Sequence, residues 1–149
     1  MTLKQWETNG WLKAEPTSNE EIANLVAMVD RDLKDASGAI SPDWRFGIAY
    51  NAALKLCTIL LRAEGYRPFH GLQHYRAIMA LPLVLGENRR DDANYLDTCR
   101  TKRHTVEYDY VGGASNADAD ELIKFTAGLK NDVLKWVKEK HSNLLKSYK

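Results

Sequence analysis

The segment Cys99–Tyr110, CRTKRHTVEYDY, places an arginine where an amphipathic helix needs an apolar residue. At 100° per residue, Arg103 shares one helix face with apolar neighbours: Leu96, Cys99, Val106 and Tyr110. Because a guanidinium cannot lose its charge, its burial requires a paired anion, a shared groove or a bound ligand. Glu107, one turn after Arg103, can supply the anion. The search for a functional site therefore begins at Arg103.

Composition limits what the chain can bind. Its 149 residues, 44% of them hydrophobic, suffice for one domain with a sizeable core, so residues 1–149 are assigned to a single domain. A formal net charge of +1 provides no overall field that attracts nucleic acid, so any polyanion site must be a local cluster. The longest apolar run, Ile78–Leu85, is too short to cross a membrane, and the N-terminus lacks a secretory signal pattern. We expect a cytoplasmic protein in which Cys57 and Cys99 are reduced core thiols.

Apolar residues recur at helical spacing along most of the chain, and no strand pattern or repeat competes with them. This predicts an all-α fold, an antiparallel up-and-down helical bundle of about five helices, because long helices joined by short loops favour that topology. An N-terminal extension, residues 1–17, carries Trp6 and Trp11, whose indoles should pack on the bundle. The expected helices are Ser18–Ala36, Ser41–Glu64, Leu72–Leu85 (bent or shortened by Pro82), Arg89–Asp109 and Ala117–Leu145.

Local signals support several helix starts. Ser18 and Glu21 have the spacing of a capping box, and Ser41 before Pro42 is typical of a first turn. Asn88 is expected to cap the fourth helix of the bundle.

The second helix of the bundle groups small residues at Ala49, Ala52 and Ala53. Such a group lets another helix approach closely, either within the bundle or across a dimer interface. Arg45 and Tyr50 on the same helix are candidates to reach a groove.

The histidines do not predict a metal site. His70 and His74 stand at i and i+4, but no HExxH pattern or cysteine pair completes a ligand set. His70 is interpreted as a helix cap and His74 as half-exposed. No glycine loop of the phosphate-binding type is present either, so we predict no metal and no cofactor.

Several stretches together resemble the HEPN family. The second helix carries an Arg-x-x-x-Ala-Tyr-Asn-Ala-Ala pattern from Arg45 to Ala53, and Leu60–Pro68 with His70 and His74 follows it. The pattern ends with Arg103, His104, Val106, Glu107, Tyr108 and Asp109 before the last helix. The resemblance covers about residues 18–138.

This resemblance implies a five-helix bundle that dimerises and places an arginine-bearing polar motif in a groove between protomers. Many HEPN proteins are metal-independent ribonucleases, often toxins or defence effectors paired with a nucleotidyltransferase-like antitoxin. In those enzymes an arginine binds the scissile phosphate, and a histidine separated from it by four to six intervening residues moves the proton. Arg103 matches the arginine, but Tyr108 stands where the shortest such spacing places histidine, and a phenol is a poor base at pH 7.

We therefore expect a HEPN-like domain with a polar groove for RNA, nucleotide or a partner protein, forming a homodimer and belonging to a toxin–antitoxin or defence module. One alternative is a metal-independent ribonuclease that uses Arg103 and His104, and another is a purely structural helical interaction protein. The candidate catalytic residues are Arg103, His104 and Tyr108, and the candidate binding residues are Arg45, Tyr50, Arg100, Glu107 and Asp109.

Overall fold

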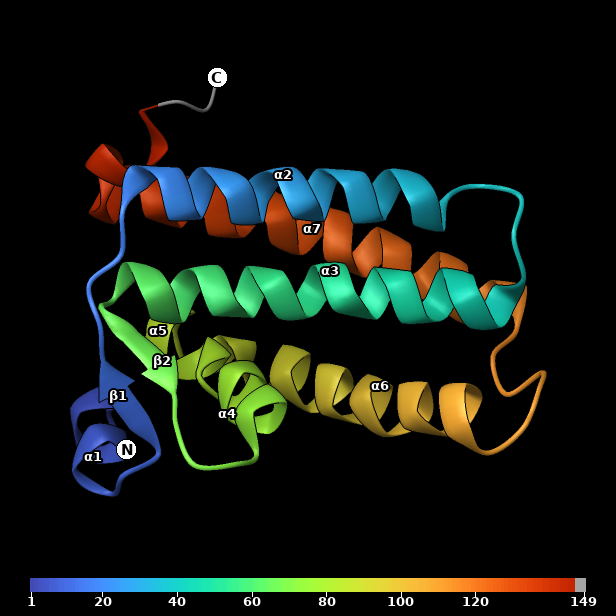
Figure 1. The fold of residues 1–149 in the computed structure, drawn as a ribbon, viewed down its shortest axis with the longest axis horizontal. Coiled ribbons are helices and arrows are strands. Elements are labelled where there is room, and N and C mark those ends of the chain that lie inside the picture. The colour runs from blue at the N-terminus through green and yellow to red at the C-terminus, as the bar shows by residue number, and fades with distance from the viewer. Residues whose placement is uncertain (147–149) are drawn as a thin grey trace.

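Four long helices run alternately up and down within residues 1–146, the part of the chain that the computed structural model describes (Figure 1). They are α2 (Asn19–Ala36), α3 (Pro42–Ala63), α6 (Arg90–Tyr108) and α7 (Asn116–Lys140). The shorter helices α4 (Gln73–Met79) and α5 (Leu81–Leu85) lie beside α6, and the turns Glu87–Arg89 and Ser142–Leu145 are 3₁₀ helices. The predicted all-α, antiparallel bundle is confirmed at this level.

Helix α3 forms the centre of the bundle, with α2 and α7 on one side and α4 and α6 on the other (Figure 1). Its buried residues point in all directions around the helix axis. They include Phe46, Ala49, Tyr50, Ala52, Ala53, Leu56, Cys57, Ile59, Leu60 and Leu61. Ala49, Ala52 and Ala53 are fully covered inside the protomer, so the small residues serve packing within the bundle.

By length and composition alone, α3 could cross a membrane. Two thirds of its apolar window is buried against the other helices, as in the core helix of a water-soluble protein.

The predicted helix starts are mostly confirmed. The Ser18 and Ser41 hydroxyls accept hydrogen bonds from the first turns of α2 and α3, and Pro42 opens α3. Asn88 is not a cap, because the 3₁₀ turn places Arg89 at the N-cap of α6, where no side chain bonds the backbone. The expected third helix is divided at Ala80 into α4 and α5, with Pro82 in the first turn of α5.

The expectation of no strands is wrong for one short element. Strands β1 (Leu12–Ala14) and β2 (Tyr66–Pro68) pair antiparallel and attach the N-terminal segment to the loop after α3. Three residues are too few to show an alternating pattern in sequence. In the same segment α1 (Leu3–Thr8) buries Trp6 in the common core, while the Arg76 guanidinium of α4 covers Trp11 at 3.8 Å from the ring centroid.

Candidate functional site

Arg103 is partly buried between α6 and α3, as its place in the apolar stripe predicts. Its Nη2 atom lies 3.0 Å from Oε2 of Glu107, and 24% of its side chain is exposed. Its Nε atom is buried and has no hydrogen-bond partner within residues 1–146. The expected ion pair is therefore present, but it leaves part of the guanidinium unsatisfied.

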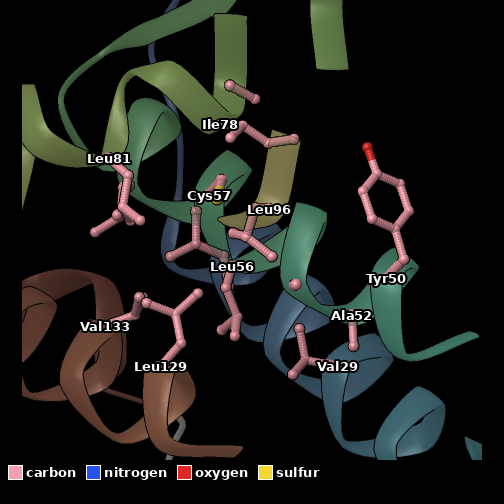
Figure 2. Close-up of a cluster of buried hydrophobic side chains, with 14 of the residues drawn as sticks. Val29, Tyr50, Ala52, Leu56, Cys57, Ile78, Leu81, Leu96, Leu129 and Val133 are labelled. Atoms are coloured by element: carbon pink, nitrogen blue, oxygen red, sulfur yellow. The ribbon is translucent and has the colours of Figure 1, made fainter. Parts of the chain in front are cut away.

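Tyr50 lies beneath Arg103 and is only 1% exposed. Figure 2 shows it at the edge of the cluster of buried apolar side chains. The Arg103 Cζ atom is 5.8 Å from the centroid of its ring. The Tyr50 hydroxyl is buried and likewise finds no hydrogen-bond partner in the part of the chain that the structure describes. Burial raises the pKa of this phenol above its ordinary value, so it is a neutral donor at physiological pH.

Tyr50 and Arg103 border a surface hollow of about 510 Å³ between α4 and α6, here called the α4–α6 hollow. Polar side chains from three helices surround it. Its lining consists of Tyr50, Leu72, Gln73, His74, Tyr75, Arg100, Thr101, Arg103 and His104.

Arg100 stands one turn before Arg103 on α6 and lines the same hollow. Its Nε atom donates a hydrogen bond to Asp97 at 2.9 Å, and its Cζ atom is 5.6 Å from the centroid of the Tyr75 ring. A guanidinium has five N–H donors, so this one bond leaves others for a ligand.

His74 enters the hollow from α4, and its ring centroid is 6.4 Å from that of Tyr50. Partial burial lowers the pKa of His74 below its ordinary value of 6.5, and the charges of Arg103 and Arg100 lower it further. The imidazole is therefore neutral at pH 7 and can accept a proton. The sequence interpretation did not place His74 beside Arg103, because α4 meets α6 only through the folding of the chain.

A second hollow, of about 330 Å³, lies between α3 and α6 and is here called the α3–α6 cleft. Arg103 lines both hollows, so they are neighbours. One wall comes from α3 and the other from α6, and Val111 stands at the loop end. The lining is Ser41, Asp43, Trp44, Gly47, Ile48, Asn51, Arg103, Val106, Glu107 and Val111. The carboxylate of Asp43 fixes this loop by accepting hydrogen bonds from the backbone of Gly112 and Ala114.

Three predicted site residues lie elsewhere. Tyr108 is 65% exposed and lines neither hollow, although its ring is 4.9 Å from that of His104. Asp109 is exposed at the C-cap of α6. Arg45 contacts the Ala36 carbonyl and the side chains of Asn116 and Asp120, so it joins the end of α2 to the start of α7. Tyr110, expected on the apolar face of α6, is 61% exposed beyond the end of the helix.

The other reactive groups form no further centre. No cluster of three or more His, Cys, Asp or Glu side chains suited to a metal occurs in residues 1–146. Both cysteines are free and buried, and burial raises the pKa of Cys57 to about 12 and of Cys99 to about 11, so neither is a reactive thiolate. His70 does not cap α4, because the N-cap residue is Leu72 and no side chain bonds the helix start.

Comparisons with family models, curated proteins and solved structures found no match for this chain.

Proposed function

We propose that this protein is a HEPN-like domain that binds the phosphates of single-stranded RNA in the α4–α6 hollow. One observation carries the proposal. Two buried donors at the same hollow, the Tyr50 hydroxyl and Arg103 Nε, have no hydrogen-bond partner within residues 1–146. A buried donor without a partner costs about 1–3 kcal/mol, so a ligand that accepts both bonds recovers this energy.

The chemistry of the lining favours a phosphate as the acceptor. Arg100 and Arg103 present planar guanidinium groups, which suit the oxygen atoms of a phosphate. Arg103 is a long side chain that is already a quarter exposed, so a small shift of it toward the phosphate would also uncover the Tyr50 hydroxyl. Asp97 and Glu107 offset part of the positive charge, so binding should be moderate and sensitive to salt.

The test is the binding of a labelled single-stranded RNA, measured by fluorescence anisotropy at several salt concentrations. Removing a hydrogen bond to a charged group costs about 1.5–3 kcal/mol, so Arg100→Ala and Arg103→Ala should each weaken binding by about 10- to 150-fold. Each variant should also make the slope of log K against log salt less steep, by the amount that corresponds to the loss of about one phosphate contact.

Arg90→Ala is the matched control. Arg90 lies on the same helix and pairs with Glu87 at 2.9 Å, three residues before it, as Arg100 pairs with Asp97. It lines neither hollow, so its removal should leave RNA affinity unchanged. Equal losses in all three variants would show a nonspecific charge effect, and an absence of RNA binding in the wild type would favour the structural alternative.

The proposal extends to assembly and context. Exposed apolar side chains gather around the end of α6, and these can meet a second copy of the chain in a homodimer. They are Tyr108, Tyr110 and Val111. A cytoplasmic toxin–antitoxin or defence module with a nucleotidyltransferase-like antitoxin remains the biological setting that we propose.

A second candidate function is metal-independent cleavage of the bound RNA, and the position of His74 favours it. The neutral imidazole of His74 shares the hollow with two arginines, so a base and phosphate-binding groups face the same space. Incubating RNA with the protein in the presence of a metal chelator, with Arg103→Ala as the control, tests for this activity.

A further inference from the structure

We infer that the α3–α6 cleft is a base-binding subsite, in which a nucleobase stacks on Trp44 while the neighbouring phosphate occupies the α4–α6 hollow. This inference rests on the proposed RNA binding and adds to it a place for the base. Arg103, the lining residue that the two hollows share, carries the first step. Arg103 forms part of both, so a phosphate held by Arg103 lies beside the cleft entrance.

Trp44 supplies the stacking surface. It lies in the first turn of α3 and is 65% exposed, whereas Trp6 is only 6% exposed. Its backbone N–H donates to the hydroxyl of Ser41, the residue that caps the helix, so the indole is carried by a fixed turn. An exposed aromatic side chain next to a phosphate site is the usual platform for a base, because every base has a π face.

Gly47 leaves room for the base. A glycine inside a helix is unfavourable relative to alanine, and this one lies near the start of the central helix α3. Apart from its chain neighbours and the backbone of its own helix turn, a Cβ atom built at Gly47 would meet nothing within 4 Å. That empty space belongs to the cleft, which Trp44, Gly47, Ile48 and Asn51 border at the spacing of one helix face.

The cleft also has polar groups suited to the edge of a base. Asn51 offers an amide donor and acceptor, and its side chain makes no hydrogen bond within the described residues 1–146. Glu107 and Arg103 stand on the opposite wall, with Ile48 and Val106 as apolar contacts. A volume of about 330 Å³ is near the lower limit for small-molecule pockets, about 300 Å³, which fits one ring system better than a whole nucleotide.

The experiment compares three probes on the full chain: a twelve-nucleotide oligoadenylate, an abasic phosphodiester oligomer of the same length, and inorganic tripolyphosphate. Trp44→Ala should weaken oligoadenylate binding by about 5- to 150-fold, the loss that corresponds to about 1–3 kcal/mol per stacked base. It should leave binding of the abasic oligomer and of tripolyphosphate unchanged. Trp44→Phe keeps an aromatic face and should restore most of the affinity.

Gly47→Leu provides an independent arm that fills the cleft without removing a contact. We expect it to weaken oligoadenylate binding at least tenfold, while Gly47→Ala, which adds one methyl group, should have a smaller effect. Both changes should keep or raise the melting temperature, by about 2–4 °C for alanine, because they improve helix propensity. Gly128→Ala in α7 is the matched control, since its Cβ is also unobstructed and it lines neither hollow.

The outcomes separate the subsite from the proposed function. The base subsite and the proposed RNA binding are both supported if the arginine variants lose binding of all three probes and the Trp44 and Gly47 variants lose binding of oligoadenylate only. Equal oligoadenylate binding by wild type, Trp44→Ala and Gly47→Leu would overturn the base subsite while RNA binding stands. A wild type that binds none of the probes would overturn both.

Discussion

The guanidinium of Arg103 covers the ring of Tyr50, with 5.8 Å between Cζ and the ring centroid. Each residue keeps one buried donor without a partner in residues 1–146, and the described chain holds two more such groups elsewhere, at Arg67 and Thr126. Native proteins satisfy nearly all buried polar groups, and each exception needs an explanation. An anion bound in the α4–α6 hollow would explain the exceptions at Tyr50 and Arg103 together.

Tyr50→Phe separates stability from binding. Removing a buried hydroxyl without a partner should raise the free energy of unfolding by about 1 kcal/mol, because phenylalanine keeps the packing. The same change should weaken RNA binding, since the hydroxyl is proposed to donate to the phosphate. Urea denaturation and fluorescence anisotropy measure the two effects. A Tyr50→Phe protein that is less stable and binds normally would show that the hydroxyl has a structural partner instead.

Arg62 and Arg103 should differ sharply in their contribution to stability. Arg62 is only 5% exposed and pairs with Glu21 at 2.9 Å, and its other nitrogens donate to the carbonyls of Glu15, Pro16 and Tyr66. Arg62→Ala leaves these acceptors unpaired and should cost about 3–5 kcal/mol. Arg103→Ala breaks a partly exposed pair whose members both keep contact with solvent, and should cost about 1 kcal/mol or less.

Thermal or urea unfolding of the two variants measures this difference. Glu87→Ala, which breaks the exposed pair with Arg90, is the control for a surface ion pair. A loss of 3 kcal/mol or more on Arg103→Ala would mean that Arg103 is a structural residue of the kind that Arg62 is.

His74 should report on the charge in the α4–α6 hollow. Its pKa is lowered in the folded chain, so the unfolded chain binds the proton more readily. Its contribution to stability is therefore complete above about pH 6.5 and is lost as the pH falls through 6.5 toward the folded pKa. Arg103→Ala should raise the pKa of His74 part of the way to 6.5, with burial and the charge of Arg100 retaining the rest of the shift.

NMR titration of the imidazole protons measures this pKa. Adding RNA should raise it, because a bound phosphate favours the charged imidazolium, and by linkage RNA should bind more tightly as the pH falls below 6.5. A His74 pKa that does not respond to saturating RNA would place the phosphate outside the hollow.

Local signals predicted most of the fold. The start of α3 at Ser41–Pro42 and its end before Gly65, which has a φ of +88°, follow from caps and backbone preferences that act over a few residues. The strands β1 and β2 were not predicted, because each has three residues and pairs with a partner more than 50 positions away. The Asn88 cap failed because a 3₁₀ turn shifted the start of α6 by one residue.

The candidate site was only half predictable. Arg103 and Glu107 are one helical turn apart, so their pairing could be derived from spacing alone. His74 and Tyr50 join them only because α4 and α3 both pack on α6, and no local pattern encodes that packing. Arg45 has the residue type of a phosphate ligand, but its helix position turns it toward Asn116 and Asp120 of α7.

We expect a homodimer at micromolar concentration, formed by the exposed apolar residues around the end of α6. Tyr110 and Val111 are 61% and 94% exposed, and a negative charge placed there would be buried without a partner in the interface. Val111→Asp should therefore yield monomers in size-exclusion chromatography with light scattering, without loss of helical content. Met28→Asp on α2 is the control at another exposed apolar residue. A wild-type protein that is monomeric at this concentration would contradict the proposal of a groove shared between two protomers.

The second candidate function is cleavage of the bound RNA. We expect the rate of this cleavage to depend on His74 and not on Tyr108. The general base contributes about 10²–10⁴-fold, so His74→Ala should lower the rate of chelator-resistant cleavage by at least about 100-fold while RNA still binds through the arginines. Tyr108 is exposed and lines neither hollow, so Tyr108→His should leave the rate unchanged despite restoring the histidine of the HEPN spacing. Product formation from a labelled RNA under single-turnover conditions measures both rates. If Tyr108→His gains activity and His74→Ala keeps it, the general base acts from position 108 at the end of α6. That result would exclude His74 from the reaction.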